Sequence, residues 1–173
     1  MLSLHLLECT LKGYDHISDL LLAKYWVITG CKYSGCRSLS DINIPSEVTS
    51  IGEYAFYGCR SLSDINIPSE VTSIGEYAFY KCALTDVSIP KGITEIMSWS
   101  FYGNDFSAIE IPEGTTTIGE HAFSYCPKLK SVNLPQSLTH IKEDAFSYCY
   151  ALSSITIPEN VISVGGSAFW KCI

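Results

Sequence analysis

The cysteines are the residues of this sequence best suited to chemistry, because thiols can bind metals or form disulfides. The sequence has eight, and Asn104 stands where a further member of their main register would fall. Six share that register: Cys36, Cys59, Cys82, Cys126, Cys149 and Cys172. Zinc sites need ligands in close pairs such as C-x-x-C, and the sequence contains no such pair. We therefore predict a ladder of buried, reduced thiols, with Asn104 hydrogen-bonded to the backbone.

Disulfides within this ladder are the alternative use of the thiols. Neighbouring ladder cysteines would lie about 5 Å apart, the spacing of strands in a sheet. That distance permits a disulfide. Parallel side-chain directions disfavour it, so we expect such bonds to be occasional at most.

Catalytic chemistry finds little support in the remaining residues. The four histidines are His5, His16, His121 and His140, and none stands at metal-ligand or triad spacing from a cysteine or aspartate. No nucleophile elbow, P-loop or dinucleotide-binding motif occurs. Catalysis needs a unique convergence of groups, whereas a repetitive chain supplies rows of like residues. We predict that the protein is not an enzyme and uses no cofactor or metal.

The common register comes from an internal repeat. Residues 36–58 read CRSLSDINIPSEVTSIGEYAFYG, and residues 59–81 repeat them with one change, Gly58 to Lys81. Looser copies follow. Every copy, including the first two, contains a proline after isoleucine or leucine: Pro45, Pro68, Pro90, Pro112, Pro135 and Pro158. A period of 22 or 23 residues is typical of stacked units that bury their apolar faces only against their neighbours.

Each repeat predicts two extended segments joined by turns. In the first full copy, the segment 39–44 alternates polar and apolar side chains over its second half, residues 41–44, which predicts a short strand. Pro45 then turns the chain, and residues 48–51 return across the core as a second short strand or an extended arm. Gly52 permits a tight turn, although Met97 and Lys142 in its column indicate that glycine is not obligatory. Phenylalanine fills one interior column without exception: Phe56, Phe79, Phe101, Phe123, Phe146 and Phe169.

This pattern resembles the BspA-like (treponemal-type) leucine-rich repeats. Their consensus sequence is approximately C-x-x-L-x-x-I-x-I-P-x-x-V-x-x-I-G-x-x-A-F-x-x-C, and residues 36–59 match it at every fixed position. The resemblance covers residues 36–172. It implies a right-handed leucine-rich-repeat solenoid, mostly β, with short parallel strands. It also implies a surface or adhesion module that binds protein or glycan ligands at the cell surface or outside the cell.

The sequence divides into two regions. Residues 36–173 hold six repeats with no evident C-terminal cap, so the last coil would leave an open edge. That edge favours a fragment or an end-to-end contact with another chain. Residues 1–35 are either an N-terminal cap or a degenerate first repeat. Their beginning lacks the basic segment of a secretory signal.

Charge and hydropathy restrict the class of partner. The net charge is −7 at pH 7, which argues against nucleic acid because phosphate binding needs clustered lysine and arginine. No apolar stretch approaches the roughly 18–20 residues of a membrane-spanning helix. We therefore predict neither nucleic-acid binding nor membrane insertion.

Two surfaces are candidates for a protein or glycan partner. One is the outward face of the first strand, which carries Asp41, Asp64 and Asp86. The other is the aromatic edge near the A-F turn. It is densest in the first three repeats, with Tyr54, Tyr57, Tyr77, Tyr80, Trp99 and Tyr102, and it continues with Tyr125, Tyr148 and Trp170. We expect a partner to engage the N-terminal half. We predict that the rings supply affinity and the aspartates supply orientation. Two alternatives stay open: the rings merely cover the neighbouring turns, or the chain is a structural spacer or self-assembling unit.

Overall fold

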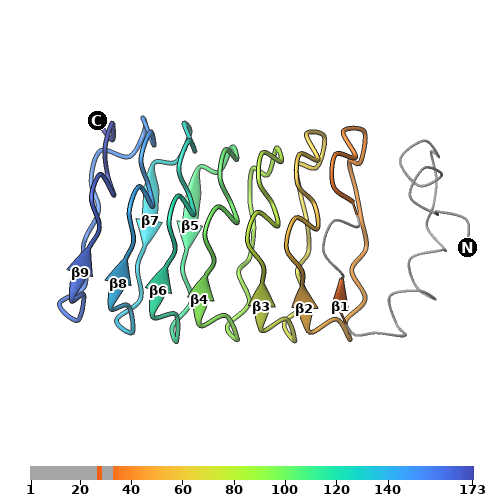
Figure 1. Ribbon diagram of the computed structural model, residues 1–173, viewed down its shortest axis with the longest axis horizontal. Coiled ribbons are helices and arrows are strands. Elements are labelled where there is room, and N and C mark those ends of the chain that lie inside the picture. Colours follow the sequence, from red (N-terminus) through yellow and green to blue (C-terminus); the bar gives the residue numbers. More distant parts are fainter. Residues whose placement is uncertain (1–26, 29–32) are drawn as a thin grey trace, which may run out of the picture.

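The chain winds into a stack of similar coils, one for each repeat, in the computed structural model of Figure 1. The structure describes residues 27–28 and 33–173, and among these it contains no helix. Its strands are β1 Val27–Ile28, β2 Ser50–Ile51, β3 Ser73–Ile74, β4 Glu95–Ile96, β5 Ala108–Glu110, β6 Thr117–Ile118, β7 Ser131–Asn133, β8 His140–Ile141 and β9 Ser163–Val164. The predicted repeat solenoid with short parallel strands is confirmed.

Equivalent strands of successive coils pair in parallel. They form a sheet β1-β2-β3, a sheet β4-β6-β8-β9 and a small sheet β5-β7. Each pair joins residues one repeat apart, as Ile51 with Ile74 and Ile118 with Ile141. Figure 1 shows the strands of the first two sheets in one row along the stack. The row lies on one wall of the coil, and β5 and β7 lie on the segment that precedes the proline turn.

The main row does not come from the segment in which the first strand was predicted. That segment forms strand only at β5 and β7, whereas the returning segment supplies the rest. One outward position of this segment is alanine in β5 and serine in β7. In three other coils the same position is aspartate: Asp41, Asp64 and Asp86. Aspartate disfavours strands because its side chain competes for backbone donors. The Asp86 carboxylate indeed accepts the Val87 N–H at 2.8 Å.

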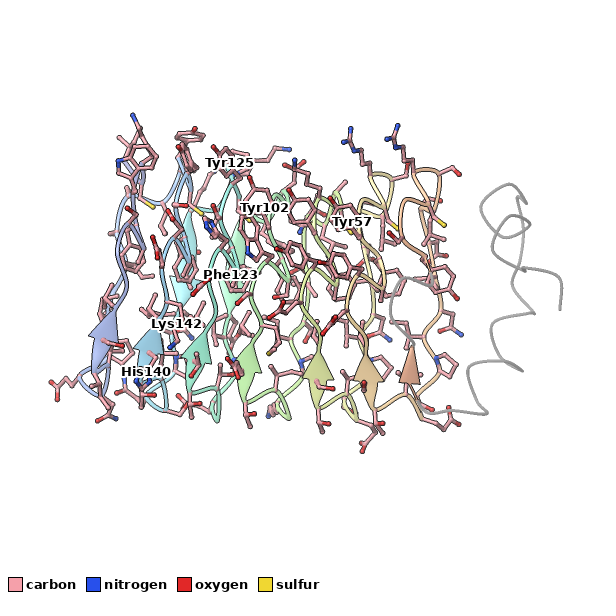
Figure 2. The ribbon with its side chains drawn as sticks, viewed as in Figure 1. Tyr57, Tyr102, Phe123, Tyr125, His140 and Lys142 are labelled. Carbon is pink, nitrogen blue, oxygen red and sulfur yellow. The ribbon has the colours of Figure 1, made fainter. Side chains whose placement is uncertain are left out.

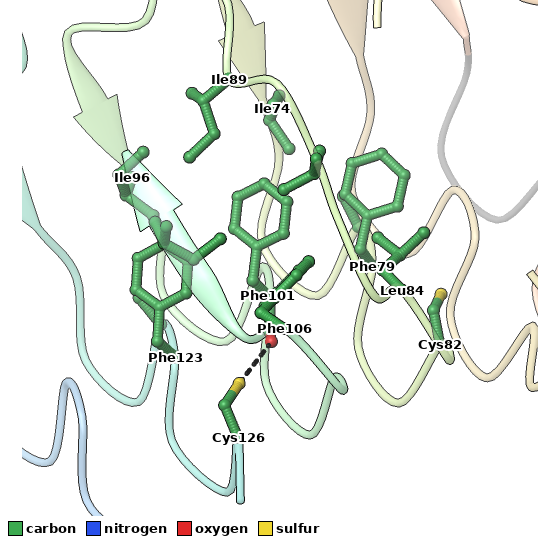
Figure 3. Close-up of a cluster of buried hydrophobic side chains, with 14 of the residues drawn as sticks. Ile74, Phe79, Cys82, Leu84, Ile89, Ile96, Phe101, Phe106, Phe123 and Cys126 are labelled. Atoms are coloured by element: carbon green, nitrogen blue, oxygen red, sulfur yellow. Dashed lines mark hydrogen bonds between the residues drawn. The ribbon is translucent and has the colours of Figure 1, made fainter. Parts of the chain in front are cut away.

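The phenylalanine column forms the centre of the core. Its rings stack nearly parallel from coil to coil, with 5.2 Å between the centroids of Phe56 and Phe79 and 5.4 Å between those of Phe101 and Phe123. The side chains of Phe56, Phe79 and Phe101 have no exposed surface. Figure 3 shows Phe79, Phe101 and Phe123 in a single file. The predicted interior column is confirmed.

The cysteine ladder connects neighbouring coils through weak hydrogen bonds. The thiol of Cys82 donates to the Phe56 carbonyl at 3.1 Å, and that of Cys126 to the Phe101 carbonyl at 3.6 Å (Figure 3). Cys149 repeats the arrangement with Phe123 at 3.2 Å. Five ladder cysteines are free, and all but the last are buried: Cys59, Cys82, Cys126, Cys149 and Cys172. The prediction of reduced thiols is confirmed at these five positions.

Cys36 is the exception, because its sulfur is in a disulfide. The prediction that the ladder thiols are reduced is therefore wrong at this position. The other ladder cysteines of the described part are free, so the bond joins Cys36 to a cysteine outside the ladder register. That partner lies outside the described residues.

The glycine column permits close approach of neighbouring coils. A Cβ atom at Gly119 would lie 2.7 Å from the Ser98 nitrogen, and one at Gly165 would lie 2.4 Å from the Glu143 nitrogen. The sheet is interrupted between β3 and β4, where Met97 occupies this column. Lys142 also occupies it, yet β6 and β8 stay paired. Glycine is therefore replaceable, as predicted.

The regular stacking extends to the first described residues. Val27 pairs with Ser50, and the ring of Tyr33 stacks on that of Phe56 at 5.2 Å and 7°. Most of residues 1–35 lie outside the described part of the chain. The choice between a cap and a degenerate repeat for that region stays a prediction.

Candidate binding surface

The aromatic edge is a double file of rings along the stack. Tyr54 stacks on Tyr77 with 4.7 Å between centroids and 4° between planes, and Tyr57 stacks on Tyr80 at 4.7 Å and 3°. Tilted contacts join the files, as at 5.7 Å between Tyr77 and Tyr80. Trp99 and Tyr102 continue the two files. The structure thus brings all six predicted aromatic residues together.

The backbone places the first file in an unusual conformation. Tyr54, Tyr77 and Trp99 have φ values of 56°, 56° and 61°. The left-handed region is an outlier for bulky side chains and costs roughly 1–2 kcal/mol per residue. In return, each backbone N–H of the file bonds the next coil, as Trp99 N–H does with the Glu120 carbonyl at 2.9 Å. The strained turn is also a coil-to-coil contact.

The second file changes register in the C-terminal half. Ser124 and Ser147 stand where Tyr57 stands in its repeat, and their buried hydroxyls bond each other at 2.8 Å. The tyrosines move one position along the chain, to Tyr125 and Tyr148, whose rings stack at 4.1 Å. Figure 2 shows Tyr57, Tyr102 and Tyr125 on the same part of their coils, away from His140 and Lys142 near the strands.

The first file loses its large rings in the same region. His121 stacks on Trp99 with 3.9 Å between centroids. The next two coils place Asp144 and Ser167 in this position, again with positive φ. His121 Nε2 lies 3.7 Å from Asp144 Oδ2. Along this file the side chains therefore become smaller after Trp99.

A groove results from these two changes. Its volume is about 400 Å³, and its lining combines aromatic rings with one carboxylate and one serine: Trp99, Tyr102, His121, Tyr125, Asp144, Tyr148, Ser167 and Trp170. The Trp170 ring stands at 79° to that of Tyr148, with 4.8 Å between centroids. No lysine or arginine lines the groove. The surface is thus aromatic with a single fixed negative charge.

The phenol hydroxyls of two groove residues have a pKa above that of an ordinary tyrosine. Burial raises the pKa of Tyr102 to about 12. The pKa of Tyr148 is raised as well, first by a hydrogen bond with the side chain of Tyr125. Both hydroxyls therefore remain protonated donors at neutral pH.

The three predicted aspartates lie elsewhere. Asp41, Asp64 and Asp86 are exposed, at the register that Ala108 of β5 holds in its coil. That register lies on the segment before the proline turn of each coil. The rings lie on the turn that follows the strands of the main row. The structure does not bring the aspartates and the rings together, and a joint role stays a prediction.

The repeat is identified by a family model described as the BspA type leucine rich repeat region. Its copies match residues 27–149 and 61–173. The chain belongs to the BspA-type leucine-rich repeat family. No curated protein matches the chain.

Solved structures support the fold of this BspA-type chain. A leucine-rich repeat protein from Bacteroides ovatus ATCC 8483 is 39% identical with a TM-score of 0.79, over 83% of this chain and 38% of that one. A leucine rich cell surface protein from Faecalibacterium prausnitzii A2-165 is 36% identical with a TM-score of 0.75, over 84% and 40%. The T. pallidum leucine-rich repeat protein is 31% identical with a TM-score of 0.76, over 80% and 66%. The chain thus spans less than half the length of the first two.

Sequence reasoning found the rings of this BspA-type surface but not the groove. Of its lining residues, Trp99 and Tyr102 belong to the predicted partner-binding set, and Tyr125, Tyr148 and Trp170 belong to the continuation of the aromatic edge, outside the half in which a partner was expected. His121 falls in the column of Tyr54, Tyr77 and Trp99, which by itself predicts a surface residue of the solenoid, and Asp144 was not singled out. Their shared column with Tyr54 was the available signal. Because the residue types differ from coil to coil, that column did not stand out as one surface.

Other kinds of site are not seen in the described part of the chain. Within residues 27–28 and 33–173, no three histidine, cysteine or acidic side chains cluster as metal ligands would. The same residues include no helix of the length and apolarity needed to cross a membrane.

Proposed function

We propose that this chain is a non-enzymatic interaction module that binds a protein or glycan partner through its aromatic edge. The observation that carries the proposal is the continuous array of rings that ends in an open groove. Tyrosine and tryptophan are favoured in binding hot spots because they bury large areas at low entropic cost. A leucine-rich cell surface protein is among the similar structures, which supports the cell surface as the site of action.

The alternative that the rings only cover neighbouring turns explains part of the array. Face-to-face stacking occupies many ring faces in the N-terminal half. Tyr125 and Trp170 nevertheless keep 41% and 50% of their surface exposed. Rings that served only as cover would have no reason to leave a groove between them.

The polar residues of the groove do not have the arrangement of a hydrolase. A serine, a histidine and an aspartate all line it, which suggests comparison with a catalytic triad. In a triad the imidazole lies between the hydroxyl and the carboxylate. Here the coil order places Asp144 between His121 and Ser167. His121 Nδ1 is buried without a hydrogen-bond partner, so no carboxylate orients that nitrogen. This order favours binding over catalysis.

The test combines a protein array and a glycan array with two matched variants. Tyr77→Ala with Trp99→Ala should weaken binding of any captured partner tenfold or more, roughly 1.4 kcal/mol. Asp41→Asn with Asp64→Asn and Asp86→Asn should mainly lower the association rate and its salt dependence. Circular dichroism would verify that both variants are folded. A folded aromatic variant that binds as the wild type does would place the site elsewhere.

Self-assembly is a second candidate, favoured by the last coil. Ile162 and Val164 are 77% and 49% exposed. Light scattering should then show a size that grows with concentration. Val164→Lys should abolish that growth, and a constant monomeric size would exclude this function.

A further inference from the structure

We propose that the groove binds a cationic side chain, the ammonium of lysine or the guanidinium of arginine, on a basic segment of a protein partner. The inference rests on the proposed function and specifies the partner's chemistry. Three observations on the groove and its surroundings support it: charge, ring geometry and the positions of the protein's own lysines.

The charge of the groove suits a cation. Asp144 is its one carboxylate, and its lining includes no lysine or arginine. The whole chain carries a net charge of −7, which attracts basic partners over long range. Anionic ligands such as phosphate would be repelled by Asp144 and would find no lysine or arginine in the lining.

The rings present the faces that attract cations. A cation is stabilised when it lies over an aromatic face within about 6 Å of the centroid, most strongly for tryptophan. Trp99 and Trp170 line the groove with three tyrosines. Because Trp170 is perpendicular to Tyr148, the groove offers ring surfaces in two orientations, as a cage around an ammonium group requires.

The protein's own lysines already use this surface. Lys81 Nζ lies 5.2 Å from the centroid of Tyr80 and 5.8 Å from that of Tyr102. Lys171 Nζ lies 5.4 Å from the centroid of Trp170. Among the described residues neither ammonium forms a salt bridge. Ammonium groups therefore rest on these rings without help from a carboxylate, which the groove would add.

The backbone of the groove is conformationally unusual. Six of its eight lining residues have φ between 53° and 61°: Trp99, His121, Tyr125, Asp144, Tyr148 and Ser167. Tyr125 and Tyr148 occupy the register in which Gly58 and Gly103 stand in other coils. Large rings are thus placed where glycine would be least strained. The same turn positions also have positive φ outside the groove, as at Tyr54, Tyr77 and Lys81, so this strain belongs to the repeat and does not by itself mark the groove.

A neutral sugar is the strongest competing ligand. It could stack on the same rings and bond the hydroxyls of Tyr102 and Ser167. It would leave the charge of Asp144 unmatched, however, and would gain nothing from the net negative charge. The cation is therefore favoured, and a sugar becomes one outcome of the test.

The experiment follows the tryptophan indole N–H signals of the folded chain by NMR during ligand titration. The chain has only three tryptophans, and two line the groove, so the signals can be assigned with Trp99→Phe and Trp170→Phe. The probes are the N-acetyl methylamides of lysine and arginine, with the norleucine derivative as the uncharged analogue and maltotriose as the glycan. We expect saturable shifts at Trp99 and Trp170 with lysine or arginine, and at least tenfold weaker binding of norleucine.

Asp144→Asn tests the role of the carboxylate. Asparagine tolerates positive φ well, so this variant should keep the turn. Affinity for the lysine probe should fall about tenfold, whereas the matched control Glu159→Gln, at an exposed carboxylate outside the groove, should leave it unchanged. Equal binding of lysine and norleucine, saturation by maltotriose alone, or an unaffected Asp144→Asn variant would each overturn the inference. A partner that is captured on arrays and lost with Tyr77→Ala and Trp99→Ala would still support the proposed function in that case.

Discussion

Replacing Asn104 by cysteine should destabilise the protein, although cysteine is the usual residue of the ladder. In full-length repeats the leucine after the ladder cysteine bonds back to it, as Leu62 N–H does with the Cys59 carbonyl at 3.0 Å. The repeat that begins at Cys82 is one residue shorter there, so Leu84 N–H cannot close the same turn. It donates instead to Asn104 Oδ1 at 3.1 Å. Asn104 therefore compensates for the shorter repeat.

The magnitude follows from the hydrogen bonds of the buried amide. Asn104 Nδ2 donates to the carbonyls of Phe79 at 2.8 Å and Phe101 at 2.9 Å. A cysteine could still donate to Phe79, as other ladder thiols do, but its sulfur is a weak acceptor for Leu84 N–H. One buried unsatisfied donor costs about 1–3 kcal/mol. Asn104→Ala would also remove both amide hydrogen bonds, which leaves the Phe79 carbonyl with only the long bond from Cys82 N–H at 3.5 Å, and would leave a small cavity, so we expect about 3–5 kcal/mol.

Urea denaturation with a thiol reductant would measure both variants against the wild type. The urea midpoints should fall. The dependence of the unfolding free energy on urea concentration should stay unchanged, because the surface exposed on unfolding stays the same. Inserting one serine after Cys82 should lengthen the repeat and restore much of the stability of Asn104→Cys. A value for Asn104→Cys within about 0.5 kcal/mol of the wild type, the usual size of neutral substitutions, would refute the reasoning.

Four further outcomes are expected. Phe79→Ala should lower stability by about 3–5 kcal/mol and reduce the cooperativity of unfolding, whereas an unchanged urea midpoint would contradict its core position. Gly119→Ala should lower the melting temperature because its Cβ would lie 2.7 Å from a backbone nitrogen, and Gly166→Ala, with nothing within 4 Å, should not. Thiol titration of unreduced protein should be slow in the native state and yield at least five thiols in denaturant; fewer would show further disulfides. Burial raises the pKa of the Cys59 thiol to about 11, above its unfolded value of about 8.5. The unfolded state therefore releases this proton first, and urea midpoints should fall as pH rises from about 8.5 towards 11; a flat profile would contradict this.

The sequence by itself determined the architecture, because a repeat must place equivalent residues at equivalent positions. Its period, its phenylalanine column and its cysteine register predicted the stack, the core and most of the free thiols. Those inferences needed only periodicity and apolar patterning. They were wrong where a single residue departs from the rule, as at Cys36, whose bond lies outside the ladder.

Only the tertiary structure decided which segment forms the main sheet and where the surface is hollowed. Strand formation depends on whether backbone donors of neighbouring coils are free, and Asp86 shows how a side chain takes one of them. The groove depends on contacts between rings from different coils and on small residues, such as Asp144, that follow them. Residue types in one column do not reveal such a hollow, because it arises from the differences between coils, which only their stacking places side by side.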